Sequence, residues 1–267
     1  MRLLRLFAPL AVMYIAACTP RPFVEGDDLP GPEFEGKPVY LGYTSVDAGV
    51  HGLSGLCLTA GGSALWAVGD KGWFGQMDFD GVATKYWGRI ADMEGITIDP
   101  ATGSLYIAQE SASQSVARVK GPDYTADDYE VLFKVKDAFG NLNSGLEGIT
   151  FYKDNTLYVG TQKGANLYLY NLEGECLSAV SLKEIASDII EVAGLCYDPE
   201  RDWLWVSDSE SHRLYVFDGA ATTMLTYYPV PFIANNESVY IDRARNCVWV
   251  GSDESTPKLY KLQFQGL

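Results

Sequence analysis

Histidine is nearly absent from this sequence, which contains only His51 and His212. Neither histidine has the spacing of a zinc site. There is also no Gly-x-Ser-x-Gly motif, so a Ser-His-Asp triad would have to be assembled from distant loops. We expect His212, beside Glu210 and Arg213, to be a surface loop residue rather than a base. These absences disfavour zinc chemistry and give no direct sign of an enzyme.

Cysteine and basic residues are also scarce. The chain has 5 cysteines, and the 4 that follow Cys18 are too few for a disulfide scaffold. Their positions in apolar strands favour buried thiols and leave at most one disulfide open: Cys57, Cys176, Cys196 and Cys247. With 20 Lys and Arg against 35 Asp and Glu, the formal charge is −15. Such acidity argues against nucleic acid as a partner and favours cations.

The only membrane-directed signal is at the N-terminus. Arg2 and Arg5 precede a short apolar stretch, and Ile15-Ala16-Ala17-Cys18 follows it. The apolar stretch is too short to span a bilayer as a permanent helix. The pattern predicts a lipoprotein signal peptide over residues 1–17, cleaved before Cys18, whose lipid would hold the chain on a membrane. An ordinary signal peptide with a chance cysteine is the alternative, but the small residues before Cys18 disfavour it.

The remaining chain divides into a linker and one domain. The Pro- and Gly-rich residues 18–38 predict a flexible, lipid-anchored linker, and residues 39–267 predict a single domain. Thr19 follows the cysteine where the sorting signal for the inner membrane has Asp. We therefore expect the protein in the cell envelope, anchored to the outer membrane.

An internal repeat predicts the fold. Five short alternating runs begin around residues 55, 95, 148, 194 and 238, separated by 40, 53, 46 and 44 residues. An aromatic residue follows each start by 10 or 11 residues, in a second strand: Trp66, Tyr106, Tyr158, Trp205 and Trp249. A period of this length is typical of a four-stranded propeller blade. We predict an all-β fold, a five-bladed β-propeller with four-stranded antiparallel blades.

The two ends of the repeat region predict how the ring closes. The fifth unit ends with only three strands, whereas the strand-like segment Pro38 to Tyr43 has no blade of its own. We expect this N-terminal strand to complete the last blade and cover its open edge. Leu182 to Ile190 is the one candidate for an amphipathic helix, inserted between blades three and four. A six-bladed ring remains the alternative, with its extra unit around Tyr124 to Asn143.

Acidic residues recur at one position of the repeat. Glu94, Glu147 and Glu237 each come directly before the central residue, while Ser54 and Ala193 occupy that position in the other two blades. The first strand of a blade lies nearest the central axis, so symmetry directs the three carboxylates towards one rim of the channel. The ends of the second strands add further acids on the same face. Converging carboxylates repel one another unless they are protonated or bind a cation.

We therefore expect Glu94, Glu147 and Glu237 to be metal ligands. A site made of oxygen atoms without His or Cys favours a hard cation, and Ca²⁺ fits irregular ligation better than Mg²⁺ does. The alternative is structural: each glutamate would accept backbone N–H bonds from a neighbouring blade. Three acids at one repeat position favour the cation.

The Glu-Gly-Ile starts at Glu94 and Glu147, with second strands such as Leu105 to Ala108 and Leu204 to Asp208, resemble the SdiA-regulated (YjiK-like) family. More distantly, the chain is similar to NHL-repeat propellers. The resemblance covers most of Gly52 to Phe264. It implies a five-bladed propeller with a calcium site and no established biochemical role. Ser54 and Ala193 depart from the pattern, which leaves the complete ligand set undetermined.

Two functions follow as alternatives. The first is a non-catalytic module that binds a protein or small-molecule ligand on the propeller face. The second is a calcium-dependent phosphohydrolase of the phytase kind, which needs basic residues converging on the acidic face to hold phosphate. The basic candidates are scattered: Lys71, Lys163, Arg118 and Arg213. The sequence favours the binding module.

Overall fold

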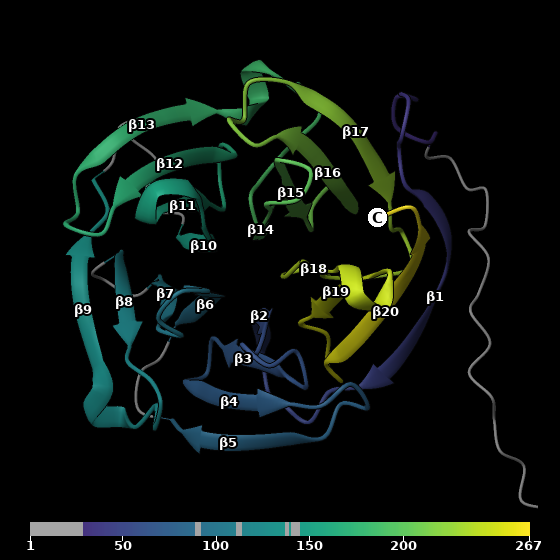
Figure 1. Ribbon diagram of the computed structural model, residues 1–267. Helices are drawn as coiled ribbons and strands as arrows, with labels where there is room; N and C mark the ends of the chain where they lie inside the picture. Colours follow the sequence, from purple (N-terminus) through teal and green to yellow (C-terminus); the bar gives the residue numbers. More distant parts are fainter. Residues whose placement is uncertain (1–28, 89–91, 111–113, 137–138, 140–144) are drawn as a thin grey trace, which may run out of the picture.

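The computed structural model describes residues 29–88, 92–110, 114–136, 139 and 145–267. They form five four-stranded antiparallel sheets arranged in a ring (Figure 1). This arrangement confirms the predicted five-bladed β-propeller. Residues 1–28, with the predicted signal peptide and Cys18, lie outside the described residues. Within the described residues no helix has the length and apolarity needed to cross a membrane.

Each of the first four blades runs outward from the channel in chain order. Blade one contains β2 (Leu53–Leu58), β3 (Leu65–Gly69), β4 (Trp73–Met77) and β5 (Ala83–Trp87). Blade two contains β6 (Met93–Ile98), β7 (Leu105–Gln109), β8 (Ser115–Val119) and β9 (Tyr129–Lys134). Blade three contains β10 (Leu146–Phe151), β11 (Thr156–Thr161), β12 (Asn166–Asn171) and β13 (Cys176–Ser181). Blade four contains β14 (Gly194–Asp198), β15 (Trp203–Asp208), β16 (Arg213–Asp218) and β17 (Met224–Pro229).

The fifth blade is built from both ends of the chain. Its sheet has the order β1 (Val39–Asp47), β20 (Lys258–Gln265), β19 (Cys247–Ser252) and β18 (Tyr240–Asp242). Figure 1 shows β1, in purple, along the outer edge of β20, in yellow. Tyr43 of β1 stacks on Phe232 with ring centroids 3.9 Å apart, which adds a packed contact to the strand pairing. The prediction that an N-terminal strand completes the last blade is confirmed.

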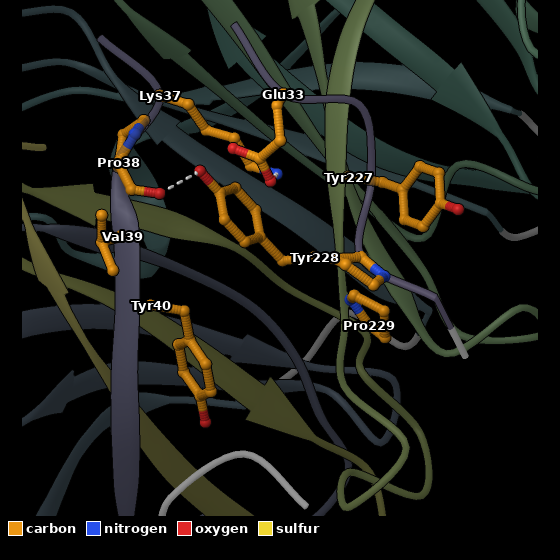
Figure 2. A pocket seen from close by; sticks show the side chains of 9 residues that line it. Glu33, Lys37, Pro38, Val39, Tyr40, Tyr227, Tyr228 and Pro229 are labelled. Atoms are coloured by element: carbon orange, nitrogen blue, oxygen red, sulfur yellow. Dashed lines mark hydrogen bonds and ion pairs between the residues drawn. The ribbon is translucent and has the colours of Figure 1, made fainter. Parts of the chain in front are cut away.

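The residues that precede β1 lie against blade four. Gly31 donates a backbone hydrogen bond to Tyr227 of β17, and the Thr226 hydroxyl donates to the Pro32 carbonyl. The Tyr228 hydroxyl donates to the Pro38 carbonyl at 2.7 Å (Figure 2). Both residues line an apolar groove of about 230 Å³. The described part of the predicted linker, residues 29–38, therefore makes specific contacts with the propeller.

The predicted helix over Leu182 to Ile190 is wrong. The structure has only a 3-10 turn at Leu182–Glu184 there. Leu182, Ala186 and Ile189 are buried in the core between blades three and four, so their spacing resembles the apolar side of a helix. An irregular loop buries the same residues, because the Asp208 carboxylate accepts the Ile190 backbone N–H and holds the segment to blade four.

Glycine allows the first strands to come very close to one another around the channel. A Cβ atom on Gly95 would lie 2.4 Å from the Glu147 carbonyl oxygen, and one on Gly55 would lie 2.6 Å from that of Glu94. No side chain fits at such distances. The two residues of the recurring Glu-Gly pair thus have different roles. The glycine lets the neighbouring blade approach, and the glutamate stands beside it at the mouth of the channel.

Candidate metal centre

β-bulges set the direction of the acidic side chains. The pairing of the first and second strands shifts between Leu53 and Gly55 in blade one and between Met93 and Gly95 in blade two. In blade three it shifts between Leu146 and Ile149. A bulge inserts an extra residue and redirects its side chain. In blades two and three the bulge contains Glu94 and Glu147, respectively.

The three predicted glutamates come together at one mouth of the channel. Glu94 and Glu147 are only 7% and 6% exposed, and Glu237 is half-buried. The negative charges of Glu94 and Glu237 both act on Glu147, and that of Glu237 acts on Glu94. The channel below them is nearly closed, with a cavity of only about 10 Å³ between the first strands.

Burial and repulsion by neighbouring carboxylates raise the pKa of all three carboxyl groups. Burial is the largest cause in each case. The pKa of Glu147 rises to about 10 and that of Glu94 to about 8, where a hydrogen bond from Ser54 partly opposes the rise. The pKa of Glu237 rises to about 7. Without a cation, this mouth therefore retains protons at neutral pH.

More carboxylates surround these three. Their charges contribute to the raised pKa values of the central glutamates, and they come from blades one, two, four and five: Asp70, Glu110, Glu191, Glu210 and Asp253. Four of them stand at or just after the ends of second strands, as the sequence predicts for that face. Lys71, 3.8 Å from Asp70, is a basic group at this rim.

Glu191 is the one member of this set that the sequence analysis missed. It is buried, receives a hydrogen bond from the Ser209 hydroxyl, and raises the pKa of both Glu147 and Glu237. Ala193 occupies the repeat position in blade four, and the acid lies two residues earlier. A search of the residues just before each repeat start could have found it.

The chemistry of this mouth suits a hard cation, but its carboxylates do not form a compact set of ligands. Among the described residues, no three Asp, Glu, His or Cys side chains lie close enough together to hold one ion directly. Ca²⁺ accepts six to eight oxygen ligands, including water and backbone carbonyls, in flexible geometry. The donor types therefore fit calcium, with part of the shell left to water or to backbone oxygens.

The predicted basic candidates do not gather around the acids. Arg118 pairs with Glu130, and Arg213 pairs with Asp188, both outside the channel mouth. Lys71 lies beside Asp70 at the rim, and Lys163 lines a hollow of about 290 Å³ that also contains Glu191 and Glu210 of the acidic set. The described residues show no convergence of these cations on a phosphate-sized site.

The remaining candidates have structural positions. A ring nitrogen of the half-buried His212, Nδ1, lies 3.0 Å from the Ile233 carbonyl oxygen, and His51 is exposed. The four described cysteines are free thiols. Cys57, Cys196 and Cys247 are buried as predicted, whereas Cys176 is exposed on β13, so the expectation of burial is wrong for that residue.

Comparison with known proteins supports the fold. No family model matches the sequence, and no curated protein matches it. A chain of a nidogen/laminin complex has a TM-score of 0.54 at 15% identity, covering 75% of this chain and 72% of that one. A gluconolactonase from Xanthomonas campestris has a TM-score of 0.54 at 18% identity, covering 79% and 71%. At such identities the likeness establishes architecture alone: the chain is a five-bladed β-propeller whose channel has an acidic mouth.

Proposed function

We propose that this protein is an envelope-anchored propeller module of the SdiA-regulated type that binds Ca²⁺ at the acidic mouth of its channel. The observation that carries the proposal is the cluster of Glu94, Glu147 and Glu237. Two buried carboxyl groups and one half-buried one, all with raised pKa values, interact electrostatically beside a nearly closed channel. A divalent cation removes their repulsion and makes the ionised forms favourable.

The ion would order the face on which a partner binds. Glu94 and Glu147 lie in blades two and three, and Glu237 precedes β18 of blade five. A cation that these carboxylates share, partly through water, would therefore link separate blades. We propose a ligand- or partner-binding role for this face. Turnover is not part of the proposal, because the basic residues that a phosphohydrolase needs are engaged elsewhere or dispersed.

Calcium binding can be measured by titration calorimetry on a chain beginning at Thr19, together with thermal unfolding. We expect saturable binding and a higher melting temperature, since a ligand present at 100 times its Kd stabilises the folded state by about 2.7 kcal/mol. The double variant Glu94→Gln, Glu147→Gln should lose both effects. Glu173→Gln, an exposed acid in a hairpin turn, is the control. Unchanged calcium-dependent stability in the double variant would contradict the site, and calcium-dependent phosphate release from phytate would support the enzyme instead.

The lipid anchor is a separate part of the proposal. It depends on the sequence Ile15-Ala16-Ala17-Cys18 and on the charged, apolar segment before it. In a bacterial host, we expect the full chain to partition into detergent and to fractionate with membranes. The Cys18→Ser variant should appear in the aqueous phase if it is processed, or retain its signal peptide if it is not. Metabolic labelling with a palmitate analogue checks the result directly, and labelling that persists in Cys18→Ser would rule out this attachment site.

A further inference from the structure

A second cavity lies at the other end of the channel, on the face opposite the carboxylates. Its volume is about 490 Å³, and the ends of β6, β10 and β14 line it. Cavities of this size commonly hold small organic ligands. The walls are largely aromatic and apolar: Ile98, Phe151, Tyr152, Tyr197, Pro199 and Tyr240. All of these except Pro199 are only partly buried, so their side chains retain surface that a ligand can cover.

Tyr152 breaks the repeat at this cavity. It lies five residues after Glu147, and the equivalent residues of the other blades are short and polar: Thr59, Asp99, Asp198 and Asp242. Each of these four accepts a backbone N–H from the turn that follows, as Asp99 does from Ala101 at 2.8 Å. In blade three the Tyr152 side chain makes no such bond to the turn that follows. The position that caps the turn in the other four blades therefore carries an aromatic ring in blade three.

Tyr240 breaks the repeat a second time in the same place. It lies three residues after Glu237, where the other blades have small side chains: Cys57, Thr97, Thr150 and Cys196. Its ring packs against the cores on several sides of the channel. The phenol thereby forms the floor of the cavity and separates it from the acidic mouth. Two departures from the repeat therefore meet at this cavity, and departures from a regular pattern are often found at functional sites.

The cavity is held in shape by bonds between blades. The Thr97 hydroxyl accepts the backbone N–H of Phe151 at 3.0 Å, and the Thr150 hydroxyl accepts that of Tyr197 at 2.9 Å. The rings of Tyr152 and Tyr197 meet edge to face, with centroids 4.6 Å apart. These contacts fix the aromatic walls before any ligand arrives, which lowers the entropy cost of binding.

The charged groups around the cavity are already paired. Lys153 lies 2.6 Å from Asp202 and over the faces of Tyr152 and Tyr197. In the adjoining hollow, Arg243 pairs with Asp198. No net charge is thus directed into the cavity by these pairs. Lys153 already covers one ring face of Tyr152 and of Tyr197, and the Tyr197 hydroxyl donates to Asp202 at 2.9 Å. The surface left for a ligand is the exposed part of the aromatic walls, which suits a flat ring with one apolar face.

We propose that this cavity is a second ligand site, which binds an uncharged ring compound by stacking on Tyr152, Tyr197 and Phe151 above the floor formed by Tyr240. A sugar and an aromatic molecule share this chemistry. The site is independent of the calcium site, because Tyr240 and the narrow channel lie between them.

Saturation-transfer NMR on a chain beginning at Thr19 tests the site with phenyl β-D-glucopyranoside as the probe. We expect saturable binding that is the same in EDTA and in calcium. The two proposals can therefore fail separately: the probe can bind a protein that binds no calcium, and calcium can bind a protein that does not bind the probe. Methyl β-D-glucopyranoside and benzyl alcohol carry only one ring type each. The one that retains binding identifies whether the sugar or the aromatic ring is recognised.

Tyr152→Asp is the informative variant, since it gives blade three the residue type found in blades two, four and five. It should fold normally and bind phenyl β-D-glucopyranoside at least fivefold more weakly. Tyr86→Ala removes an exposed tyrosine of β5 and should leave binding unchanged. Absence of saturable binding by all three probes would overturn the proposal. So would binding that survives in Tyr152→Asp, provided that its melting temperature shows a folded protein.

Discussion

The metal-free protein should lose stability as the pH rises from about 5 to 9, which is the reverse of ordinary acid denaturation. The carboxyl groups of Glu94, Glu147 and Glu237 have pKa values raised to about 8, 10 and 7. In the unfolded chain they ionise near 4.5. Between these limits the folded state holds protons that the unfolded state has released, so its stability is complete below pH 4.5 and falls as each folded pKa is approached.

The size of this effect follows from the number of retained protons. Each retained proton makes the free energy of unfolding fall as the pH rises, until the pH passes the folded-state pKa of its carboxyl group. Glu237 ceases to contribute above about pH 7 and Glu94 above about pH 8, so the slope should be steepest between pH 5 and 7. Saturating calcium should remove most of the loss, because it favours the ionised carboxylates.

Urea unfolding of the chain beginning at Thr19, in EDTA and at several pH values, measures this dependence. Glu147→Gln should flatten the curve, because an amide cannot ionise and Glu94 then loses a repelling neighbour. Glu173→Gln changes an exposed acid and should leave the slope as it is. A free energy of unfolding that is constant or rises between pH 5 and 8 in EDTA would show that the three carboxyl groups do not share a buried environment.

The blades could be predicted because each repeats the same local signals. The aromatic residue of the second strand, for example Trp66 or Trp205, is fully buried between sheets, so every blade must contain one. The central glycines could also be predicted from the repeat, since Gly55 and Gly95 lie against the backbone of the next blade. Such positions depend on geometry that symmetry imposes five times, and for that reason they recur in the sequence.

Features that belong to one blade could not be predicted in this way. Glu191 reaches the acidic mouth from a loop of irregular length, and Leu182, Ala186 and Ile189 imitate the spacing of a helix while packing as a loop. The sequence contains Tyr152 at its repeat position, but only the structure shows that the equivalent residues of other blades cap a turn. Pairing between distant turns also leaves no local signal.

The contact between Asp198 and Arg243 is such a pair and should be among the most sensitive in the molecule. Asp198 is the last residue of β14, with its side chain 1% exposed, and Arg243 lies in the turn after β18. The guanidinium donates from Nε to Asp198 Oδ1 at 2.8 Å and from Nη2 to Oδ2. The pair joins blade four to the blade that closes the ring.

Arg243→Met should therefore lower the free energy of unfolding by about 3–5 kcal/mol, because it leaves a buried carboxylate without its partner. At about 2–4 °C for each kcal/mol in a protein of this size, the melting temperature should fall by roughly 10 °C. Arg201→Met is the control, since it removes a partly buried arginine that is not paired with a buried carboxylate. We expect a smaller loss, from its hydrogen bonds with the Gly36 and Gly266 carbonyls. The double variant Asp198→Asn, Arg243→Met should regain much of the stability, since an amide is far less costly to bury than an unpaired charge. If the double variant is less stable than Arg243→Met, the loss of stability in Arg243→Met comes from packing around the arginine side chain and not from the unpaired Asp198 carboxylate.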